Sequence, residues 1–396
     1  MSTATQLDDA DALAGYRDRF LRADDVVAYL DGNSLGRPLK ASGDRITAFV
    51  EEQWGGRLIR GWDESWMALP DRIGDDLGRV VLGAAPGQTT IGDSTTVLLY
   101  KLIRAAARAR SGRTEIVLDR DNFPTDRYIV EGIAAELGMT VVWIDAGDAL
   151  TAEAVADVVG TNTAVVVLSH IAYRSGYIAD AAAITSIAHD AGALVVLDLC
   201  HSVGVVPVEL DAWKVDLAVG CTYKYLNGGP GAPAFAYVRA ELQSELRQPI
   251  QGWIGSAAPF EMGPGYEPAA GIRGFLSGTP PVVGMLAMQD MIALIDTVGL
   301  SAVRAKSVAL TTFAIDLSDD LLADAVLATP RDSALRGSHI TLDHPRFAEL
   351  VPGLWARGVI PDFRRPSGLR LGLSPLSTSF AEVEAGIRAI AEELAR

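Results

Sequence analysis

Cysteine is scarce in this chain. Only two of its 396 residues are cysteines, Cys200 and Cys221, and both lie in apolar runs. Neither has the spacing of a zinc ligand pair, and a low cysteine content is typical of a reducing compartment, in which disulfides do not persist. We therefore expect both residues to be small core side chains, without a disulfide.

Histidine and positive charge are also limited. The five histidines show no paired spacing on one helix face, which argues against a metal site. Asp and Glu outnumber Lys and Arg by 50 to 34, and the resulting net charge of −16 disfavours nucleic acid and anionic membrane surfaces as partners. A small anionic ligand in a local pocket remains compatible with this charge.

Long apolar runs are absent. No stretch is long enough to span a bilayer, and the first ten residues are acidic without an apolar core, so we expect neither a transmembrane helix nor a secretory signal. The proportions of apolar residues (49 %) and charged residues (21 %) are ordinary for a globular protein. These features predict a soluble, cytoplasmic protein, and its length predicts two domains.

Short apolar strands alternate with helical patterns from residue 85 to about residue 240. We expect strands at 115–118, 140–144, 164–168, 194–197 and 217–219, with helices at 128–137, 152–159 and 181–191. Strands that are apolar on both faces and separated by helices predict a mainly parallel sheet covered on both sides. Ligands of such sheets bind at the carboxyl ends of the strands.

The remaining segments predict further elements of an α/β protein. Helices are expected at 42–54, 66–82, 282–297 and 380–394, and strands at 338–342 and 369–373. We expect a large domain over residues 61–285 and a smaller α+β domain over residues 286–396, with residues 1–60 packed against the smaller one.

Two charged residues are expected at strand ends of the large domain. Lys224 lies between an apolar run and a glycine- and proline-rich series, and apolar neighbours would desolvate it and favour a neutral, nucleophilic amine. Asp198 ends an apolar strand, where a carboxylate needs a cationic partner. That partner is a protonated pyridine nitrogen, His201 or an arginine.

A phosphate seat and an aromatic platform complete the pattern. Small hydroxyl residues after Gly92 open a helix whose free N–H groups suit a phosphate, although a plain N-cap has the same pattern. Phe123 offers a flat apolar surface near Asp126, although a core phenylalanine would look alike. An imine-forming lysine, a carboxylate for a pyridinium, an aromatic ring and a phosphate seat together match pyridoxal 5′-phosphate (PLP).

The motifs around these residues resemble those of kynureninases, which are PLP-dependent hydrolases of the aspartate-aminotransferase-like fold (fold type I). The resemblance runs over nearly the whole chain and implies a large PLP-transferase-like domain with a smaller α+β domain. The matching motifs are Asp31-Gly-Asn-Ser-Leu-Gly36, Phe123-Pro-Thr-Asp126, Asp198-Leu-Cys-His201, Gly220-Cys-Thr-Tyr-Lys-Tyr-Leu-Asn-Gly-Gly-Pro-Gly231, Gly252-Trp-Ile-Gly255, Ile272-Arg-Gly-Phe-Leu-Ser-Gly-Thr-Pro-Pro281, Arg336-Gly-Ser-His339 and Gly358-Val-Ile-Pro-Asp-Phe-Arg364.

Carried over residue by residue, the resemblance implies a role for each matching position. Lys224 forms the Schiff base with PLP, Asp198 binds the pyridine nitrogen beside His201, and Phe123 stacks on the ring. Arg370 binds the substrate carboxylate as a bidentate fork. The other implied cofactor residues are Thr95, Thr96, Pro124, Thr125, Asp126, Ser169 and Tyr223, with Trp253 and Thr279 contributed by the second subunit of a homodimer. The substrate's aniline ring would be bordered by Trp62, Asn33 and Ser34.

The implied reaction is the hydrolysis of L-kynurenine to anthranilate and L-alanine, a step of tryptophan catabolism and NAD biosynthesis. 3-Hydroxy-L-kynurenine is a second candidate substrate, but the indole of Trp62 would favour the unsubstituted ring because it offers the hydroxyl no polar partner. Lys224 and Asp198 are the expected catalytic residues. Tyr223 either handles protons late in the reaction or only binds the phosphate.

Two positions depart from the family pattern, and two other functions stay open. Thr279 stands where some members carry asparagine, and Ser377 stands where a tyrosine is expected. A cysteine desulfurase-like PLP lyase would need a mobile cysteine in the C-terminal half, where only Cys221 is available. A non-catalytic protein of the same fold is the other alternative. A nicotinamide-dependent enzyme is disfavoured because no Gly-x-Gly-x-x-Gly follows the first strand.

Overall fold

A seven-stranded sheet forms the centre of the computed structural model, which describes residues 3–147 and 149–396. The strand order is β2-β8-β7-β6-β5-β3-β4. Strands β3 to β7 run parallel to one another, whereas β8 runs antiparallel to both β7 and β2. The strands are β2 (Thr89–Gly92), β3 (Glu115–Asp119), β4 (Thr140–Ile144), β5 (Thr163–Ser169), β6 (Leu194–Asp198), β7 (Leu217–Gly220) and β8 (Ala234–Val238).

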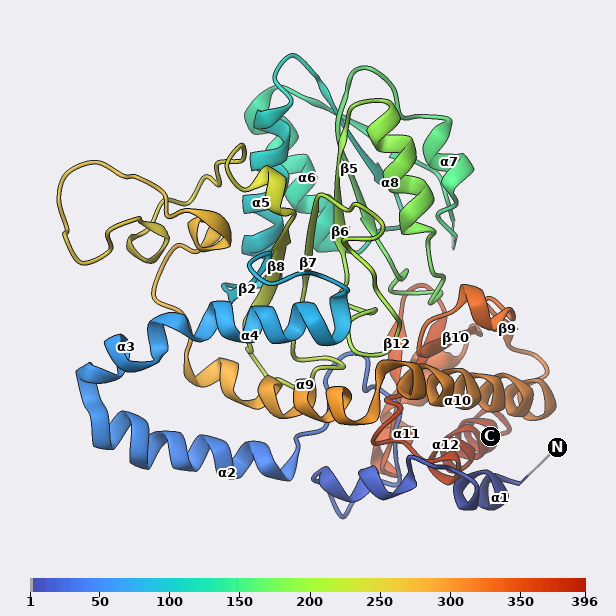
Figure 1. Ribbon diagram of the computed structural model, residues 1–396. Coiled ribbons are helices and arrows are strands. Elements are labelled where there is room, and N and C mark those ends of the chain that lie inside the picture. Colours follow the sequence, from blue (N-terminus) through green and yellow to red (C-terminus); the bar gives the residue numbers. More distant parts are fainter. Residues whose placement is uncertain (1–2, 148) are drawn as a thin grey trace.

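Helices cover both faces of this sheet (Figure 1). Along β5, Val165 and Val167 pack with α5 and α6 in one apolar cluster, whereas Val166 and Leu168 belong to the cluster on the other face. Alternate side chains of a strand point to opposite faces, which explains why the strands are apolar throughout. The predicted sheet is confirmed. Its helices are α4 (Leu69–Leu77), α5 (Thr95–Ala109), α6 (Pro124–Leu137), α7 (Ala152–Ala156), α8 (Ala181–Asp190) and α9 (Leu286–Val298).

A second, antiparallel sheet lies in the C-terminal part of the chain, with the strand order β12-β13-β10-β9. It packs with three helices around a separate apolar cluster that also takes in Ala28 and Leu30. Strand β1 (Ala28–Tyr29) pairs with β11 (Val359–Ile360). The domain boundaries at residues 60 and 285 stay a prediction. The elements are β9 (Val326–Leu327), β10 (His339–Asp343), β12 (Asp362–Arg364), β13 (Gly368–Gly372), α10 (Leu300–Leu321), α11 (Phe347–Ala356) and α12 (Phe380–Leu394).

Several expected helices are segmented. The helix expected at 42–54 is α2 (Lys40–Ala48) followed by a π-helical stretch (Phe49–Gly55), and the one expected at 66–82 is a 3₁₀ turn, α4 and a second π-helical stretch (Gly78–Leu82). The short helix α3 (Gly61–Glu64) connects the two regions. Figure 1 shows α2, α3 and the loop between β8 and α9 projecting to the left of the main body.

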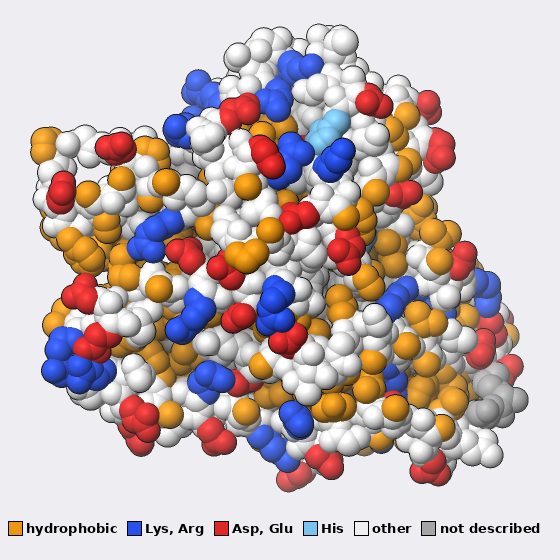
Figure 2. All heavy atoms as spheres, viewed as in Figure 1, with side chains coloured by type: hydrophobic (Ala, Val, Ile, Leu, Met, Phe, Trp, Pro, Cys, Tyr) orange, Lys and Arg blue, Asp and Glu red, His pale blue; other side chains and the backbone are white. Residues whose placement is uncertain are grey.

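The surface is mixed in charge on the face that Figure 2 shows, and hydrophobic side chains gather on the lobe at the left. Within residues 3–147 and 149–396, no single helix is long and apolar enough to cross a bilayer. The segments Val283–Val298 and Leu300–Leu321 reach that length only as a pair, and they are bent by 91° at their junction.

Candidate active site

A cavity of about 90 Å³ lies at the carboxyl ends of β5, β6 and β7. The starts of α5 and α6 close its other side. The sheet therefore brings most of the predicted cofactor residues together at the edge where such sheets bind ligands. The lining residues are Thr95, Thr96, Phe123, Thr125, Asp126, Ser169, Ile171, Tyr173, Asp198, Cys200, His201, Tyr223 and Lys224.

A larger cavity, about 620 Å³, lies between α2, α4 and α9. None of the predicted site residues lines it. Its walls combine apolar side chains such as Phe49, Trp66 and Leu286 with charged ones, which are Asp44, Arg45, Glu52 and Arg72. The smaller cavity is therefore the candidate active site, because chemistry and not volume decides the assignment.

Lys224 lies on the turn that follows β7. Its Nζ atom is 3.0 Å from Nε2 of His201 and 6.0 Å from the ring centroid of Phe123. Burial, followed by the charge of Lys224, lowers the pKa of His201 well below its ordinary range. His201 is therefore neutral, and its Nε2 accepts a hydrogen bond from the lysine. Nδ1 of His201 is buried and has no partner in the described chain, so it can donate to a ligand.

Asp198 and Asp126 form a pair of buried carboxyl groups. Asp198 is the last residue of β6, and its Oδ1 accepts a hydrogen bond from the backbone N–H of Cys200 at 2.6 Å. Asp126 lies in the first turn of α6, and its Oδ2 has no donor partner in the described chain. Burial and the neighbouring Asp198 raise the pKa of Asp126 well above its ordinary range. The protonated form of Asp126 is therefore favoured.

The start of α5 forms the opposite end of the cavity. Ser94 caps the helix by accepting from the Val97 N–H at 3.4 Å, and the residue before it, Asp93, has a φ of +49°. Lys101 is fully buried and donates to Asp93 at 2.5 Å and to the Phe275 carbonyl at 3.1 Å. This lysine holds the left-handed turn that orients the first turn of α5.

The residues present fit PLP. The positive end of a 15-residue helix suits a phosphate, Phe123 offers a ring surface, and the Asp198–Asp126 pair offers carboxyl oxygens to a pyridinium. Two buried polar atoms, Oδ2 of Asp126 and Nδ1 of His201, have no partner in the described chain and would gain one from a polar ligand. Lys224 is within the same cavity.

Arg370 lies in the middle of β13 and is only 1 % exposed. It donates to the Tyr173 carbonyl at 2.7 Å and to Ser34 Oγ at 2.8 Å, and it pairs with Asp362 at 2.7 Å. With its amide oriented to satisfy its neighbours, Asn33 accepts from Nε of Arg370 at 3.0 Å. Asn33 and Ser34 thus contact Arg370 and not the cavity, and the assignment of Arg370 to the substrate carboxylate stays a prediction.

Four other predicted residues do not line the cavity, and one of them, Pro124, is the first residue of α6. Trp62 packs edge-on against Trp66 with ring centroids 5.3 Å apart. Trp253 is 38 % exposed, and its ring centroid lies 6.0 Å from that of Phe260. Thr279 is exposed. Trp62 lies in α3, and Trp253 and Thr279 lie between β8 and α9, so the roles predicted for these three residues stay predictions.

Sequence reasoning missed some residues of the cavity. Tyr173 contacts Phe123 edge-on, with ring centroids 5.4 Å apart, and its carbonyl accepts from Arg370. Its position just after β5, at the binding edge of the sheet, was the available signal. Cys200 was expected to be a core residue; both cysteines are free and buried, but Cys200 also lines the cavity.

Family models match most of the chain. The model described as "Aminotransferase class-V" matches residues 85–342, and the one described as "Kynureninase C-terminal domain" matches residues 303–390. A kynureninase from Pseudomonas fluorescens is 40 % identical over 98 % of this chain and 94 % of its own length. A kynureninase from Burkholderia pseudomallei strain 1106a is 42 % identical over 96 % of this chain and 92 % of its own length.

Solved structures share the fold at low sequence identity. A cysteine desulfurase from Thermococcus onnurineus NA1 has a TM-score of 0.79 at 17 % identity, covering 99 % of this chain and 98 % of its own. The cysteine desulfurase CsdA from Escherichia coli has a TM-score of 0.81 at 18 % identity, covering 97 % and 98 %. These likenesses establish the PLP-dependent fold alone. Because the chain is about 40 % identical to kynureninases over nearly its full length, it belongs to the kynureninase family of PLP-dependent hydrolases.

Proposed function

We propose that this chain hydrolyses the Cβ–Cγ bond of L-kynurenine to give anthranilate and L-alanine. One observation carries the proposal: Lys224, the Asp198–Asp126 pair, Phe123 and the start of α5 meet in one cavity. The chain that builds this cavity is 40 % identical, over 98 % of its length, to a kynureninase.

Lys224 and His201 would handle the first proton. When bound, PLP supplies an electron sink for negative charge that develops on the substrate carbons. Lys224 Nζ would hold the cofactor and, once released, take the proton from the substrate Cα. Neutral His201 accepts from Nζ at 3.0 Å and so orients the amine without adding a second positive charge.

The carboxyl pair would keep the cofactor's ring nitrogen protonated. Asp198 would face that nitrogen, and protonated Asp126 would donate a hydrogen bond to Asp198. A fixed carboxylate in a buried site stabilises a cation more than it would in water.

Tyr223 would act as a proton donor. It is half-buried, and burial raises its pKa, so the phenol keeps its proton at neutral pH. A neutral phenol can donate to the cofactor phosphate and can return a proton to the substrate Cβ after bond cleavage. Both of its predicted roles are thus compatible with one protonation state.

Arg370 would bind the substrate carboxylate by exchanging partners. Its Nη2 atom contacts both Ser34 and Asp362, so an incoming carboxylate could replace one of these acceptors without leaving the buried guanidinium unpaired. We propose that Asn33 and Ser34 serve the substrate indirectly, by fixing this arginine.

We also propose a homodimer with shared active sites. Trp62, Trp253 and Thr279 lie away from the cavity of their own chain, and large apolar side chains are exposed on the same projecting parts. These are Trp54 (55 %), Ile59 (76 %), Phe260 (57 %) and Met262 (80 %). Exposure of several large apolar side chains is typical of an interface. A cytoplasmic location is proposed as well, in keeping with two free, buried thiols.

The direct test is an anthranilate fluorescence assay. The PLP-loaded protein should release anthranilate from L-kynurenine, and Lys224→Ala should release none above background. Absence of anthranilate from the parent protein, despite a visible cofactor absorption band, would point to a non-catalytic protein. Activity that survives in Lys224→Ala would refute the assignment of this lysine.

A further inference from the structure

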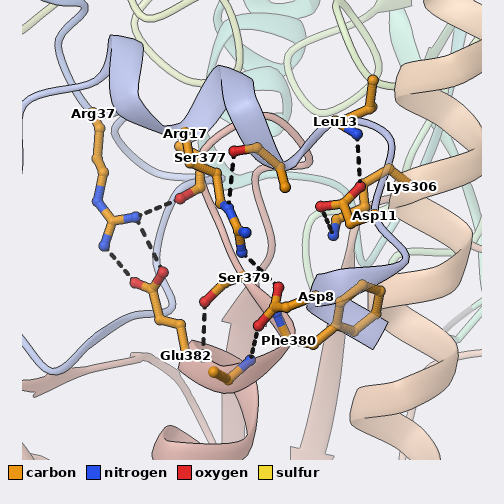
Figure 3. A network of polar contacts seen from close by, with 12 residues as sticks. Asp8, Asp11, Leu13, Arg17, Arg37, Lys306, Ser377, Ser379, Phe380 and Glu382 are labelled. Atoms are coloured by element: carbon orange, nitrogen blue, oxygen red, sulfur yellow. Dashed lines mark hydrogen bonds and ion pairs between the residues drawn. The ribbon is translucent and has the colours of Figure 1, made fainter. Parts of the chain in front are cut away.

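A network of charged side chains holds the N-terminal segment, residues 4–37, against the C-terminal helices (Figure 3). Asp8 pairs with Arg17 at 2.5 Å and accepts from two backbone N–H groups at the start of α12, at 3.1 and 2.9 Å. Lys306 of α10 pairs with Asp11 at 2.6 Å, and both side chains are nearly fully buried. The segment is therefore anchored at several points.

Arg37 makes the last of these anchoring contacts before the chain turns toward α2. Its guanidinium pairs with Glu382 of α12 and donates to the Ser377 carbonyl at 3.0 Å. Only 11 % of the Arg37 side chain and 7 % of the Glu382 side chain are exposed. Glu382 also accepts from the Tyr29 N–H at 2.7 Å. A buried pair of this kind fixes position, because removal of either partner leaves a buried charge uncompensated.

The backbone of the same segment touches the turn that carries Lys224. The side chain of Asn227 donates to the Arg37 carbonyl at 2.6 Å, and the Gly36 N–H donates to the Tyr223 carbonyl at 2.9 Å. The contact is close, since a Cβ atom on Gly36 would lie 2.3 Å from the Lys224 carbonyl oxygen. Asn227 itself has a φ of +52°, a conformation that a non-glycine residue keeps only when its surroundings hold it.

We propose that Arg37 is a positioning residue that holds the Lys224 turn in place. Its side chain fixes residues 36 and 37 to α12. The backbone of these two residues then holds the Lys224 turn through hydrogen bonds with Tyr223 and Asn227. The inference rests on the proposed function, because its kinetic effect is exerted on the amine that moves the substrate proton. A displacement of about 1 Å at a reacting group can cost roughly 100-fold in rate, so even a partial loosening of the turn is measurable.

The test uses Arg37→Met and Asn227→Gly in the full-length, PLP-loaded protein. Arg37→Met removes the anchor, and Asn227→Gly removes the donor to Arg37 while keeping the left-handed backbone accessible. Each should lower kcat about 10-fold and change KM by less than about threefold. The double variant should be no worse than the more affected single variant, because both break one chain of contacts. Arg37→Lys should recover part of the loss.

A matched control comes from the same network. Lys306→Met removes the buried pair with Asp11 from the same N-terminal segment, yet neither residue contacts the Lys224 turn. It should lower Tm at least as much as Arg37→Met but leave kcat within about twofold of the parent. Parent-like kcat in both Arg37→Met and Asn227→Gly would overturn the proposal, and so would an equal loss of kcat in Lys306→Met.

A spectroscopic readout separates this inference from the proposed function. The pH titration of the visible cofactor band reports the surroundings of Lys224 without any substrate. Its midpoint should shift in Arg37→Met and Asn227→Gly and not in Lys306→Met. If the parent protein makes no anthranilate, the proposed function fails, but this shift still decides the role of Arg37; an unshifted band in both variants would refute it.

Discussion

At the residue scale, the cavity holds two neighbouring buried carboxyl groups, Asp126 and Asp198. Burial and the neighbouring Asp198 raise the pKa of Asp126 and favour its protonated form, and Asp198 is the residue that we propose to face a pyridinium. The sequence predicted both residues, since each follows a strand end or opens a helix. It did not predict that one of them favours its protonated form, because that state depends on how closely two residues 72 positions apart approach in the fold.

This difference predicts unequal effects of the same chemical change. An amide resembles a protonated carboxyl group, so Asp126→Asn should lower kcat by less than about 10-fold, whereas Asp198→Asn removes the charge and should lower it by about 100-fold or more. The measurement is kcat for anthranilate release, with cofactor occupancy checked by absorbance. Equal losses in the two variants would contradict the assignment of the charge to Asp198.

At the element scale, regular patterns predicted most elements, and special contacts decided their ends. β4 and α12 have the predicted bounds, because their apolar spacing is unbroken. α7 ends at Ala156, three residues before the predicted end at Val159. The π-helical stretches after α2 and α4 could not be predicted, because a shift from i+4 to i+5 hydrogen bonds leaves the apolar spacing nearly unchanged.

The start of α5 depends on the ion pair between the buried Lys101 and the half-buried Asp93, which gives a second prediction. Lys101→Met would leave Asp93 without its partner and release the left-handed turn before the helix. The affinity for PLP should fall about 10-fold or more, because the N–H groups in the first turn of α5 would no longer be oriented to donate hydrogen bonds to the phosphate. Equilibrium dialysis of PLP measures this. Arg104→Gln, which removes the more exposed pair with Glu136 from the same helix, is the control and should keep parent affinity.

At the scale of the whole molecule, the family motifs predicted that distant segments meet, but not how. Asn33 and Ser34 were expected at the substrate ring, whereas they contact Arg370. The sequence did not predict the role of Arg37, because its partners Asn227 and Glu382 lie 190 and 345 positions away. Local periodicity carries no information on such contacts. The placement of Trp62 at the substrate ring stays a prediction, and so does the contribution of Trp253 and Thr279 by a second subunit.

Shared sites predict complementation between two inactive proteins. Lys224→Ala lacks its own amine, and a Trp253→Ala/Thr279→Ala variant would damage only the site of its partner. Each should be nearly inactive alone, whereas refolding an equal mixture should restore about a quarter of the parent activity, because half of the dimers then hold one intact site. No recovery in a mixture shown by light scattering to be dimeric would refute the exchange of residues.

The contact between Arg37 and Glu382 also has a consequence for how the enzyme is made. Because 345 positions separate them, Arg37 leaves the ribosome long before its anchor is synthesised, about 20 to 70 seconds earlier at typical translation rates. The nascent chain can form the central sheet during that time. The Lys224 turn, however, lacks the support of the Arg37–Glu382 pair until α12 has been synthesised. The fixed geometry of the Lys224 turn, on which the proposed rate depends, is therefore among the last properties that the newly made protein acquires.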